Sequence, residues 1–158
     1  MQKLTPCLWF DFNAEEAVNH YMSIFKDGKV LEVTRYGDAV PQLKDKVLTM
    51  RFTLEGQEFL ALNGGPQFPF TEAISISVDC ANQADVDVLW SKLTADGGSP
   101  GQCGWLKDKF GLSWQIVPSA LVQMLKDPDA SRSQRVMGAM MQMRKIDIAA
   151  LRAAYEGK

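Results

Sequence analysis

The chain has 158 residues, which is enough for one domain or for two small halves that share a core. Hydrophobic residues make up 46% of it and charged residues 23%, as in ordinary soluble globular proteins, and its net charge of −2 excludes the basic footprint of a nucleic-acid-binding protein. No apolar run approaches the ~20 residues that a membrane span needs, and the N-terminus does not resemble a signal peptide. The composition therefore predicts a cytoplasmic protein with neither a nucleic-acid nor a membrane partner.

The three cysteines, Cys7, Cys80 and Cys103, are an odd number without CxxC spacing. This pattern argues against a disulfide framework or a zinc site and fits a reducing compartment. We expect them to be buried free thiols. A reactive Cys103 would need a general base or an electropositive neighbour, and we do not pair it with the only histidine, His20, which lies in a predicted helix.

The first half predicts a strand, a helix and three more strands. Residues 5–11 alternate as a strand does, and apolar residues then recur at helical spacing through residues 14–25. Asn13, with Glu16 three residues later, predicts an N-cap and capping box, and Gly28 follows the end of the helix. The further strands are expected at residues 29–36, 47–54 and 58–62.

The second half repeats this pattern. The segment LWFDFNAEEAVNHYMSIF (8–25) aligns without a gap with ISVDCANQADVDVLWSKL (76–93), and in this alignment Val18 corresponds to Val86. Both copies are an alternating strand, a short polar corner and an amphipathic helix. Short strands are expected near residues 99–107 and 112–117, separated by a turn at 108–111.

Beyond Pro118 the pattern becomes helical, with segments at residues 120–126, 131–143 and 147–155. The methionines of this region, at positions 137, 140, 141 and 143, are expected in the core or in a dimer contact rather than on a plastic partner-binding surface. The predicted organisation is therefore a domain of residues 1–118, with module one at 1–66 and module two at 73–118, followed by a C-terminal helical extension at 119–158.

Several strings of the sequence resemble the vicinal oxygen chelate superfamily, which includes glyoxalase I and the bleomycin-resistance proteins. Within it, the chain is similar to the PhnB-like branch, often labelled 3-demethylubiquinone-9 3-methyltransferase. The strings are PCLWFDFNAEEAVNHY (6–21), LNGGP (62–66), CGWLKDKFGLSWQIVP (103–118) and AMMQMRKIDIAAL (139–151). The resemblance implies an α+β fold in which two βαβββ modules form a half-open barrel around a cleft, and it implies a homodimer.

Metal-dependent members of this superfamily hold a divalent ion with four inward side chains, usually His or Glu, which lets the ion polarise the substrate. The corresponding positions in this chain are Pro6 or Cys7, Ala61, Ala73 and Gln115, and none of them is His, Asp or Glu. A neutral amide is a poor sole anchor for a divalent cation. We therefore predict no metal site and no other cofactor.

Gln115 occupies the place of a catalytic glutamate without its charge. It either orients a ligand in an apolar cleft or satisfies a neighbouring strand, and the sequence leaves both interpretations open. Alternation puts Trp114 on the opposite face from Gln115. Core packing is favoured for any one tryptophan, and Trp105 is the preferred pocket residue. The candidate ligand-binding residues are Trp9, Asn63, Cys103, Trp105 and Gln115, and no residue has a predicted catalytic role.

The sequence thus predicts a small-molecule-binding protein, or a metal-independent enzyme, whose ligand is unknown. A methyltransferase, as the family label states, is a second hypothesis, but neither Gly64-Gly65 nor Gly97-Gly98 forms the strand–glycine-turn–helix pattern typical of S-adenosylmethionine sites. A drug-sequestering, resistance-type dimer is a third, and a noncatalytic dimer whose methionine-rich tail binds a protein is a fourth. Fold analogy alone does not establish chemistry.

Overall fold

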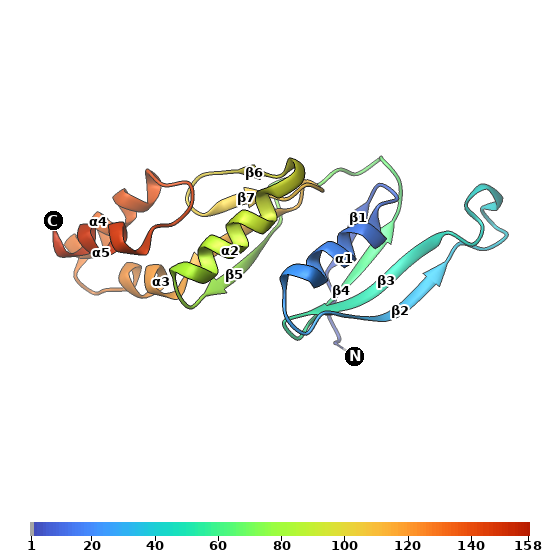
Figure 1. The fold of residues 1–158 in the computed structure, drawn as a ribbon, viewed down its shortest axis with the longest axis horizontal. Coiled ribbons are helices and arrows are strands. Elements are labelled where there is room, and N and C mark those ends of the chain that lie inside the picture. The colour runs from blue at the N-terminus through green and yellow to red at the C-terminus, as the bar shows by residue number, and fades with distance from the viewer. Residues whose placement is uncertain (1) are drawn as a thin grey trace. The chain divides into compact units, whose positions relative to one another are not determined.

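A computed structural model describes residues 2–158, which divide into two compact units, residues 2–70 and Thr71–Lys158 (Figure 1). The first unit contains β1 (Cys7–Phe10), α1 (Ala14–Ile24), β2 (Lys29–Arg35), the 3₁₀ helix η1 (Pro41–Leu43), β3 (Val47–Leu54) and β4 (Gln57–Asn63). The second contains β5 (Ser75–Cys80), α2 (Gln83–Thr94), η2 (Ala95–Gly97), β6 (Ser99–Pro100), β7 (Trp105–Lys107), β8 (Ser113–Pro118), α3 (Ser119–Leu125), α4 (Ala130–Met141) and α5 (Ile148–Glu156). The predicted α+β fold class is confirmed.

Each unit holds one four-stranded sheet, and the two sheets have the same strand order. The order is β1-β4-β3-β2 in the first and β5-β8-β7-β6 in the second. In each sheet the first strand runs parallel to the last one, β1 beside β4 and β5 beside β8, and the other neighbours are antiparallel. The helices that follow Pro118 belong to the second unit.

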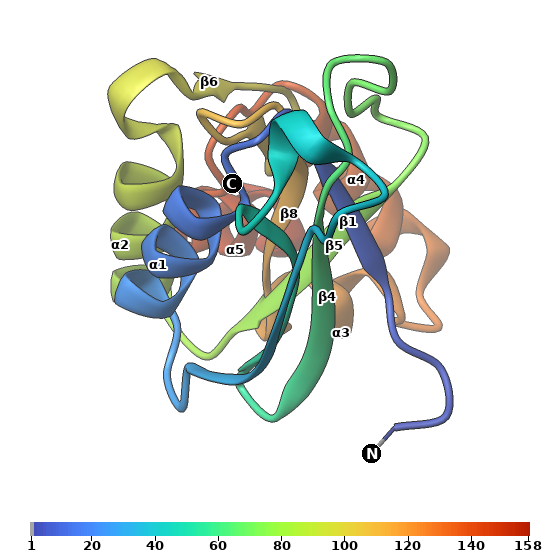
Figure 2. The same ribbon diagram turned by 90° about the vertical axis from the view of Figure 1, so that its right-hand side faces the viewer.

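Helix α1 covers one face of the first sheet, beside β3 and β4 (Figure 2). Its buried residues are Ala14, Ala17, Val18 and Tyr21. Their spacing of three and four residues places them on one stripe of the helix, which is the periodicity seen in the sequence. The sheet contributes apolar residues to the same core, including Phe10, Phe52 and Ala61, all of them at most 2% exposed.

The start of α1 differs from the prediction. Asn13 stands at the N-cap position, but its side chain accepts no N–H of the helix. Instead the Oδ1 atom of Asn63, at the end of β4, accepts from the Ala14 backbone N–H at 2.9 Å. The predicted side-chain cap at Asn13 is therefore wrong.

In the second unit, the side chain of Asn82 does cap α2, because it accepts from the Asp85 backbone N–H at 2.9 Å. In return, the carboxylate of Asp85 accepts from the backbone N–H of Ala81, the residue before the cap, at 3.2 Å.

Helix α2 packs on β7 and β8. Its buried residues, Val86 and Leu93, align in the sequence with Val18 of α1 and with Phe25, the C-cap residue of α1. Both of these residues are buried as well. Aligned positions of the two helices face the sheet of their own unit. The repeated hydrophobic pattern therefore produces the same packing of a helix on a sheet in both units.

Helices α3, α4 and α5, orange and red in Figure 1, close around a core of their own. Its buried residues are Leu121, Val136, Ile146 and Leu151. Met140 and Met143 pack against this core, as expected for methionines at helical spacing, whereas Met137 and Met141 are exposed. Among residues 2–158, no helix has the length and apolar character that crossing a membrane requires.

The three cysteines are free thiols, but they differ in exposure. Cys80 is buried as expected, and Cys103 is partly buried. Cys7, at the start of β1, is exposed, so the expectation that all three thiols are buried is wrong for this residue.

Candidate functional site

The two faces of β8 differ in character. Trp114 and Ile116 are 2% and 0% exposed and lie in the core on the side of α2. Gln115 is half-buried and lies on the opposite face. This is the alternation predicted from the sequence, and it assigns Trp114 to the core.

Cross-strand pairing extends the face of Gln115 over three strands. Gln115 pairs with Trp105 of β7 and with Ser77 of β5, while Ser113 pairs with Lys107 and with Ser75. Directly paired residues point to the same side of a sheet, so these side chains share one surface. We call it the polar face of the second sheet, and its residues are Ser75, Ser77, Trp105, Lys107, Ser113 and Gln115.

The side-chain amide of Gln115 forms a hydrogen bond with the neighbouring strand. Its Nε2 donates to the hydroxyl of Ser75 at 2.9 Å, which connects β8 to β5. Of the two interpretations that the sequence left open, this hydrogen bond supports the structural one.

A pocket of about 520 Å³ opens beside the polar face. Its walls come from β6, β7, the loop of residues 101–103, the first residue of β8 and Glu72. Trp105 and Cys103, two of the residues predicted to bind a ligand, line it, and Gln115 does not. Small-molecule sites usually enclose roughly 300–1,000 Å³, so the pocket has the size of a site for a metabolite.

An ion pair lies in the wall of this pocket. The Nζ atom of Lys107 is 2.5 Å from the Oε1 atom of Glu72, and the two side chains are 42% and 61% exposed. The hydrogen bond from Lys107 lowers the pKa of the Glu72 carboxyl below its ordinary value. Glu72 is therefore ionised at neutral pH. Exposed pairs of this kind contribute little to the stability of a fold, because water and salt screen them.

Ser113 contributes a buried hydroxyl to the pocket. The residue is 1% exposed, and its Oγ has no hydrogen-bond partner among residues 2–158. Buried hydroxyls normally have a partner, because leaving one unsatisfied costs about 1–3 kcal/mol. A polar group that reached this Oγ from the pocket would supply the missing partner. Ser113 and Lys107 lie within the string of residues 103–118, but that string assigns them no role, and Glu72 lies outside it. Only the place of these residues on and beside the sheet shows their relevance.

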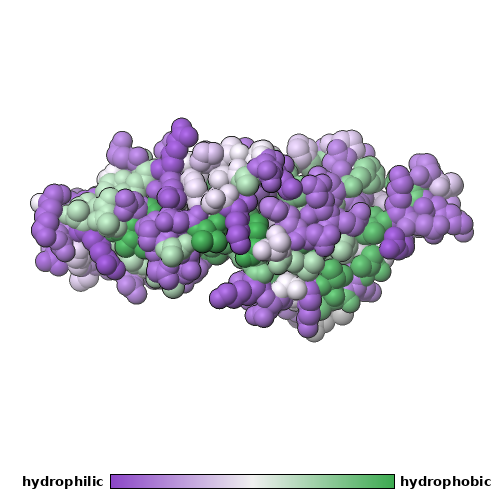
Figure 3. Space-filling model, viewed as in Figure 1, coloured by the Kyte–Doolittle hydropathy of each residue, from purple (hydrophilic) through white to green (hydrophobic). Residues whose placement is uncertain are grey.

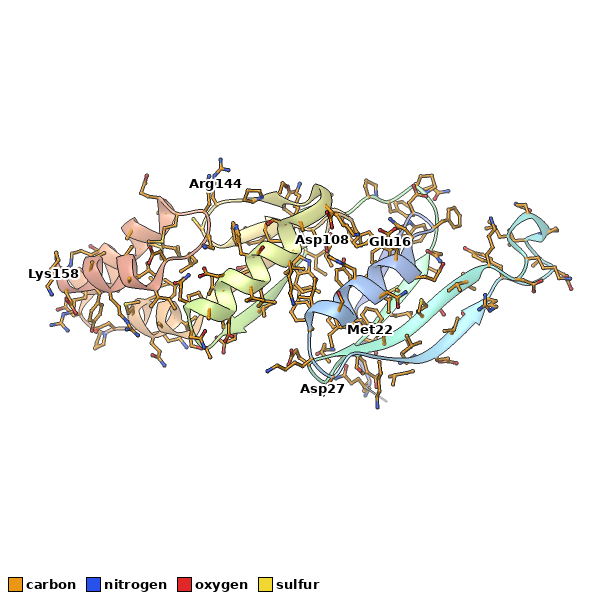
Figure 4. The ribbon with its side chains drawn as sticks, in the orientation of Figure 1. Glu16, Met22, Asp27, Asp108, Arg144 and Lys158 are labelled. Atoms are coloured by element: carbon orange, nitrogen blue, oxygen red, sulfur yellow. The ribbon has the colours of Figure 1, made fainter. Side chains whose placement is uncertain are left out.

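The Cys103 loop is held by the segment between α4 and α5. Cys103 has a left-handed φ of 57°, and its backbone N–H donates to the carbonyl of Met143 at 2.8 Å. The next residue, Gly104, donates to the carbonyl of Arg144 at 2.8 Å, while the side chain of Arg144 projects away from the loop (Figure 4). The helical extension thus fixes one rim of the pocket.

Trp9, a third predicted ligand-binding residue, lies in the first unit and holds the Asn-Gly-Gly-Pro loop. Its indole Nε1 donates to the carbonyl of Gly65 at 2.8 Å, and its ring meets Phe68 edge-on, with 4.9 Å between the ring centroids. A Cβ atom at Gly64 would lie only 2.3 Å from the Trp9 ring. Packing against Trp9 therefore explains this glycine without an anion-binding role.

Asn63 is buried, with 3% of its surface exposed. Its Nδ2 donates to a Glu15 carboxylate oxygen at 2.6 Å and to the carbonyl of Val47 at 3.0 Å, while its Oδ1 caps α1. Both hydrogens of the amide are thus engaged within the protein. This arrangement favours a structural role for Asn63 over the predicted ligand binding.

The residues at the superfamily's metal positions do not fit a divalent ion. Cys7 and Gln115 offer one thiol and one amide, and Ala61 is fully buried on the α1 side of its sheet. Divalent cations need several converging carboxylate, imidazole or thiolate ligands. In the described part of the chain, no three His, Cys, Asp or Glu side chains are grouped so that they could hold a metal ion.

Comparisons with known proteins agree with the strings identified in the sequence. Residues 2–117 match the family model of 3-demethylubiquinone-9 3-methyltransferase. The PhnB protein from Bacillus cereus is 34% identical, with a TM-score of 0.67 over 75% of this chain and 100% of that chain. A protein from Pseudomonas aeruginosa shares the fold at 23% identity, with a TM-score of 0.61 over 75% of this chain and 98% of that chain. A comparison with curated proteins found no significant match. The chain therefore belongs to the 3-demethylubiquinone-9 3-methyltransferase family, which includes this PhnB protein.

Proposed function

We propose that the protein binds a small organic molecule in the pocket of its second unit, either as a binding protein or as an enzyme that works without a metal ion. The observation that carries the proposal is Ser113, a residue of the pocket wall whose buried hydroxyl has no partner among residues 2–158. Trp105, half-buried in the same wall, supplies the aromatic surface on which organic ligands commonly pack.

The proposal can be tested by ligand-observed NMR with a library of small fragments. Ser113→Ala removes the hydroxyl, and Trp105→Ala removes the aromatic wall. Because the hydroxyl has no partner in the described part of the chain, Ser113→Ala is expected to fold with undiminished stability. Ser77→Ala is the matched control, since Ser77 lies on the same face but does not line the pocket.

We expect some fragments to bind the wild-type protein and the Ser77→Ala variant with equal affinity. Their affinity for each of the two pocket variants should be at least about fivefold lower, which corresponds to the loss of a buried hydrogen bond of about 1 kcal/mol. A screen without hits, or hits that bind all variants equally, would overturn the proposal.

The family name refers to methyl transfer. If S-adenosylmethionine binds and Trp105→Ala abolishes its binding, methyl transfer replaces our proposal.

We also propose that the ligand binds without a metal ion or other cofactor, because the donor atoms at the superfamily's metal positions are unsuited to one. Elemental analysis after incubation with nickel, zinc, manganese and iron tests this point. We expect far less than one ion per chain, and stoichiometric metal would contradict the proposal.

A homodimer, which the family resemblance implies, is a further proposal. Strand β2 lies at the edge of the first sheet, and its Val30, Leu31 and Val33 are 39%, 42% and 41% exposed. Figure 3 shows hydrophobic surface, in green, where β2 and β3 lie. A second chain would remove this surface from water. Light scattering is expected to give twice the mass of one chain, and a monomer at micromolar concentration would contradict a dimer.

A further inference from the structure

We propose that the ligand of this pocket is an organic anion, whose carboxylate or phosphate group binds Lys107 in place of Glu72 while its apolar part packs on Trp105. The inference rests on the proposed function of the pocket and specifies the chemistry of its ligand. It is carried by the positions of four residues that line one pocket. They bear an ammonium group, a competing carboxylate, an indole and a buried hydroxyl that has no partner among residues 2–158.

Lys107 and Ser113 are placed to contact the same atoms. They are direct cross-strand partners on β7 and β8, so their side chains leave the sheet side by side on the polar face. One group donates through an ammonium and the other through a hydroxyl. Two adjacent donors suit an anion, because hydrogen bonds to a charged acceptor are roughly twice as strong as neutral ones.

The carboxylate of Glu72 pairs with the ammonium group of Lys107, whereas the hydroxyl of Ser113 has no partner among residues 2–158. Glu72 lies before β5, outside the sheet, and its side chain is 61% exposed. Because exposed ion pairs are weak, a ligand carboxylate can replace that of Glu72 at little cost. Glu72 thus stands where a ligand anion would bind, as an internal competitor that lowers the affinity without blocking the site.

Trp105 selects for the remainder of the ligand. It lies on β7 two residues before Lys107, so both side chains project from the same face of the strand. Neighbouring side chains on one face of a strand are roughly 7 Å apart. This spacing fits a molecule in which one ring or short apolar chain separates the anionic group from the surface of the indole.

The test uses four probes of similar size, benzoate, phenyl phosphate, benzamide and benzylamine, titrated by ligand-observed NMR at low ionic strength. The protein variants are Glu72→Gln and Lys107→Met. Two matched controls change the same charges outside the pocket. Lys92→Met removes an ammonium from α2, and Glu156→Gln removes one partner of the exposed Glu156–Lys158 pair.

We expect benzoate or phenyl phosphate to bind more tightly than the neutral and cationic probes. Glu72→Gln is expected to tighten anion binding about two- to fivefold, because the competing carboxylate is gone. Lys107→Met is expected to weaken it by about tenfold or more. Neither control should change it, and benzamide should not respond to Glu72→Gln. The preference between the two anions tells a carboxylate ligand from a phosphate.

Anions that do not bind, or that bind Glu72→Gln no more tightly than the wild type, would overturn the inference. Binding of benzamide or benzylamine that depends on Trp105 would still uphold the proposed function, because the pocket would then hold a neutral or cationic ligand. If none of the four probes and no fragment of the library binds, both the inference and the proposed function are overturned.

Discussion

Asp108 and Trp114 are joined by a buried hydrogen bond that closes the turn between β7 and β8. The carboxylate of Asp108, which is 2% exposed and labelled in Figure 4, accepts from the indole Nε1 at 2.9 Å. Its other oxygen accepts from the backbone N–H groups of Phe110 and Leu112 at 2.8 and 3.1 Å. The string CGWLKDKFGLSWQIVP (103–118) therefore builds the hairpin that carries the pocket.

Asp108→Asn is expected to destabilise the protein by about 2–4 kcal/mol. The amide oxygen can keep the two backbone hydrogen bonds, but its NH₂ group then faces the N–H of Trp114, so two donors meet in a buried site. Urea denaturation followed by circular dichroism measures the loss. Asp38→Asn is the control, because the Asp38 side chain is 87% exposed and pairs only at the surface with Lys44. Equal stability of the two variants would show that the buried contact is unimportant.

The helices and most strands could be predicted because their apolar residues repeat with a period of either two or about 3.6. The stripe of α1 from Ala14 to Tyr21 is one example. The cap of the same helix could not be predicted in this way. Asn63, which provides it, is 49 residues distant from Ala14 in the chain, so the contact depends on where β4 ends.

The candidate site was predicted only in part, for a similar reason. Trp105 and Cys103 could be proposed because an aromatic ring and a thiol are conspicuous side chains in the string of residues 103–118, and both line the pocket. Ser113 and Lys107 become neighbours only through the register of β7 and β8, and Glu72 reaches Lys107 across 35 positions of the chain. Single-sequence patterns record which face a strand residue occupies, but they contain no register.

Gly64→Ala is expected to destabilise the first unit by about 1–3 kcal/mol. The new methyl group would lie 2.3 Å from atoms of the Trp9 ring, which must move and thereby strain its hydrogen bond to Gly65. Thermal denaturation and tryptophan fluorescence report both effects. Gly37→Ala is the control, because a Cβ atom there meets nothing within 4 Å. If Gly64→Ala is as stable as the control, the loop is not held by this packing.

Gln83→Ala is expected to loosen the helical extension. The side chain of Gln83 donates to the carbonyl of Ile146 at 2.9 Å and accepts from the N–H of Ile148 at 2.8 Å, which ties α2 to the start of α5. Losing both bonds is expected to cost about 1–3 kcal/mol. Hydrogen exchange should become faster in α5, while in the first sheet it should not change.

The control for this variant is Gln123→Ala, which removes an exposed glutamine from α3. It should leave exchange in α5 unchanged. Uniformly faster exchange in both sheets and all helices of Gln83→Ala would mean that the extension has no separate anchor at this residue.

Cys80 is expected to make the fold less stable in alkaline solution. Burial, together with the nearby carboxylates of Asp85 and Asp79, raises the pKa of its thiol from 9.0 to about 11. Below pH 9 the thiol is protonated in both states, whereas between pH 9 and 11 only the unfolded chain loses the proton, so stability falls as the pH rises. Urea denaturation of the wild type and of Cys80→Ala at several pH values isolates this effect, because all other titrating groups are shared. The stability advantage of the wild type is expected to shrink by up to about 3 kcal/mol over this range. An advantage that stays constant from pH 8 to pH 11 would show that the thiol titrates normally in the fold.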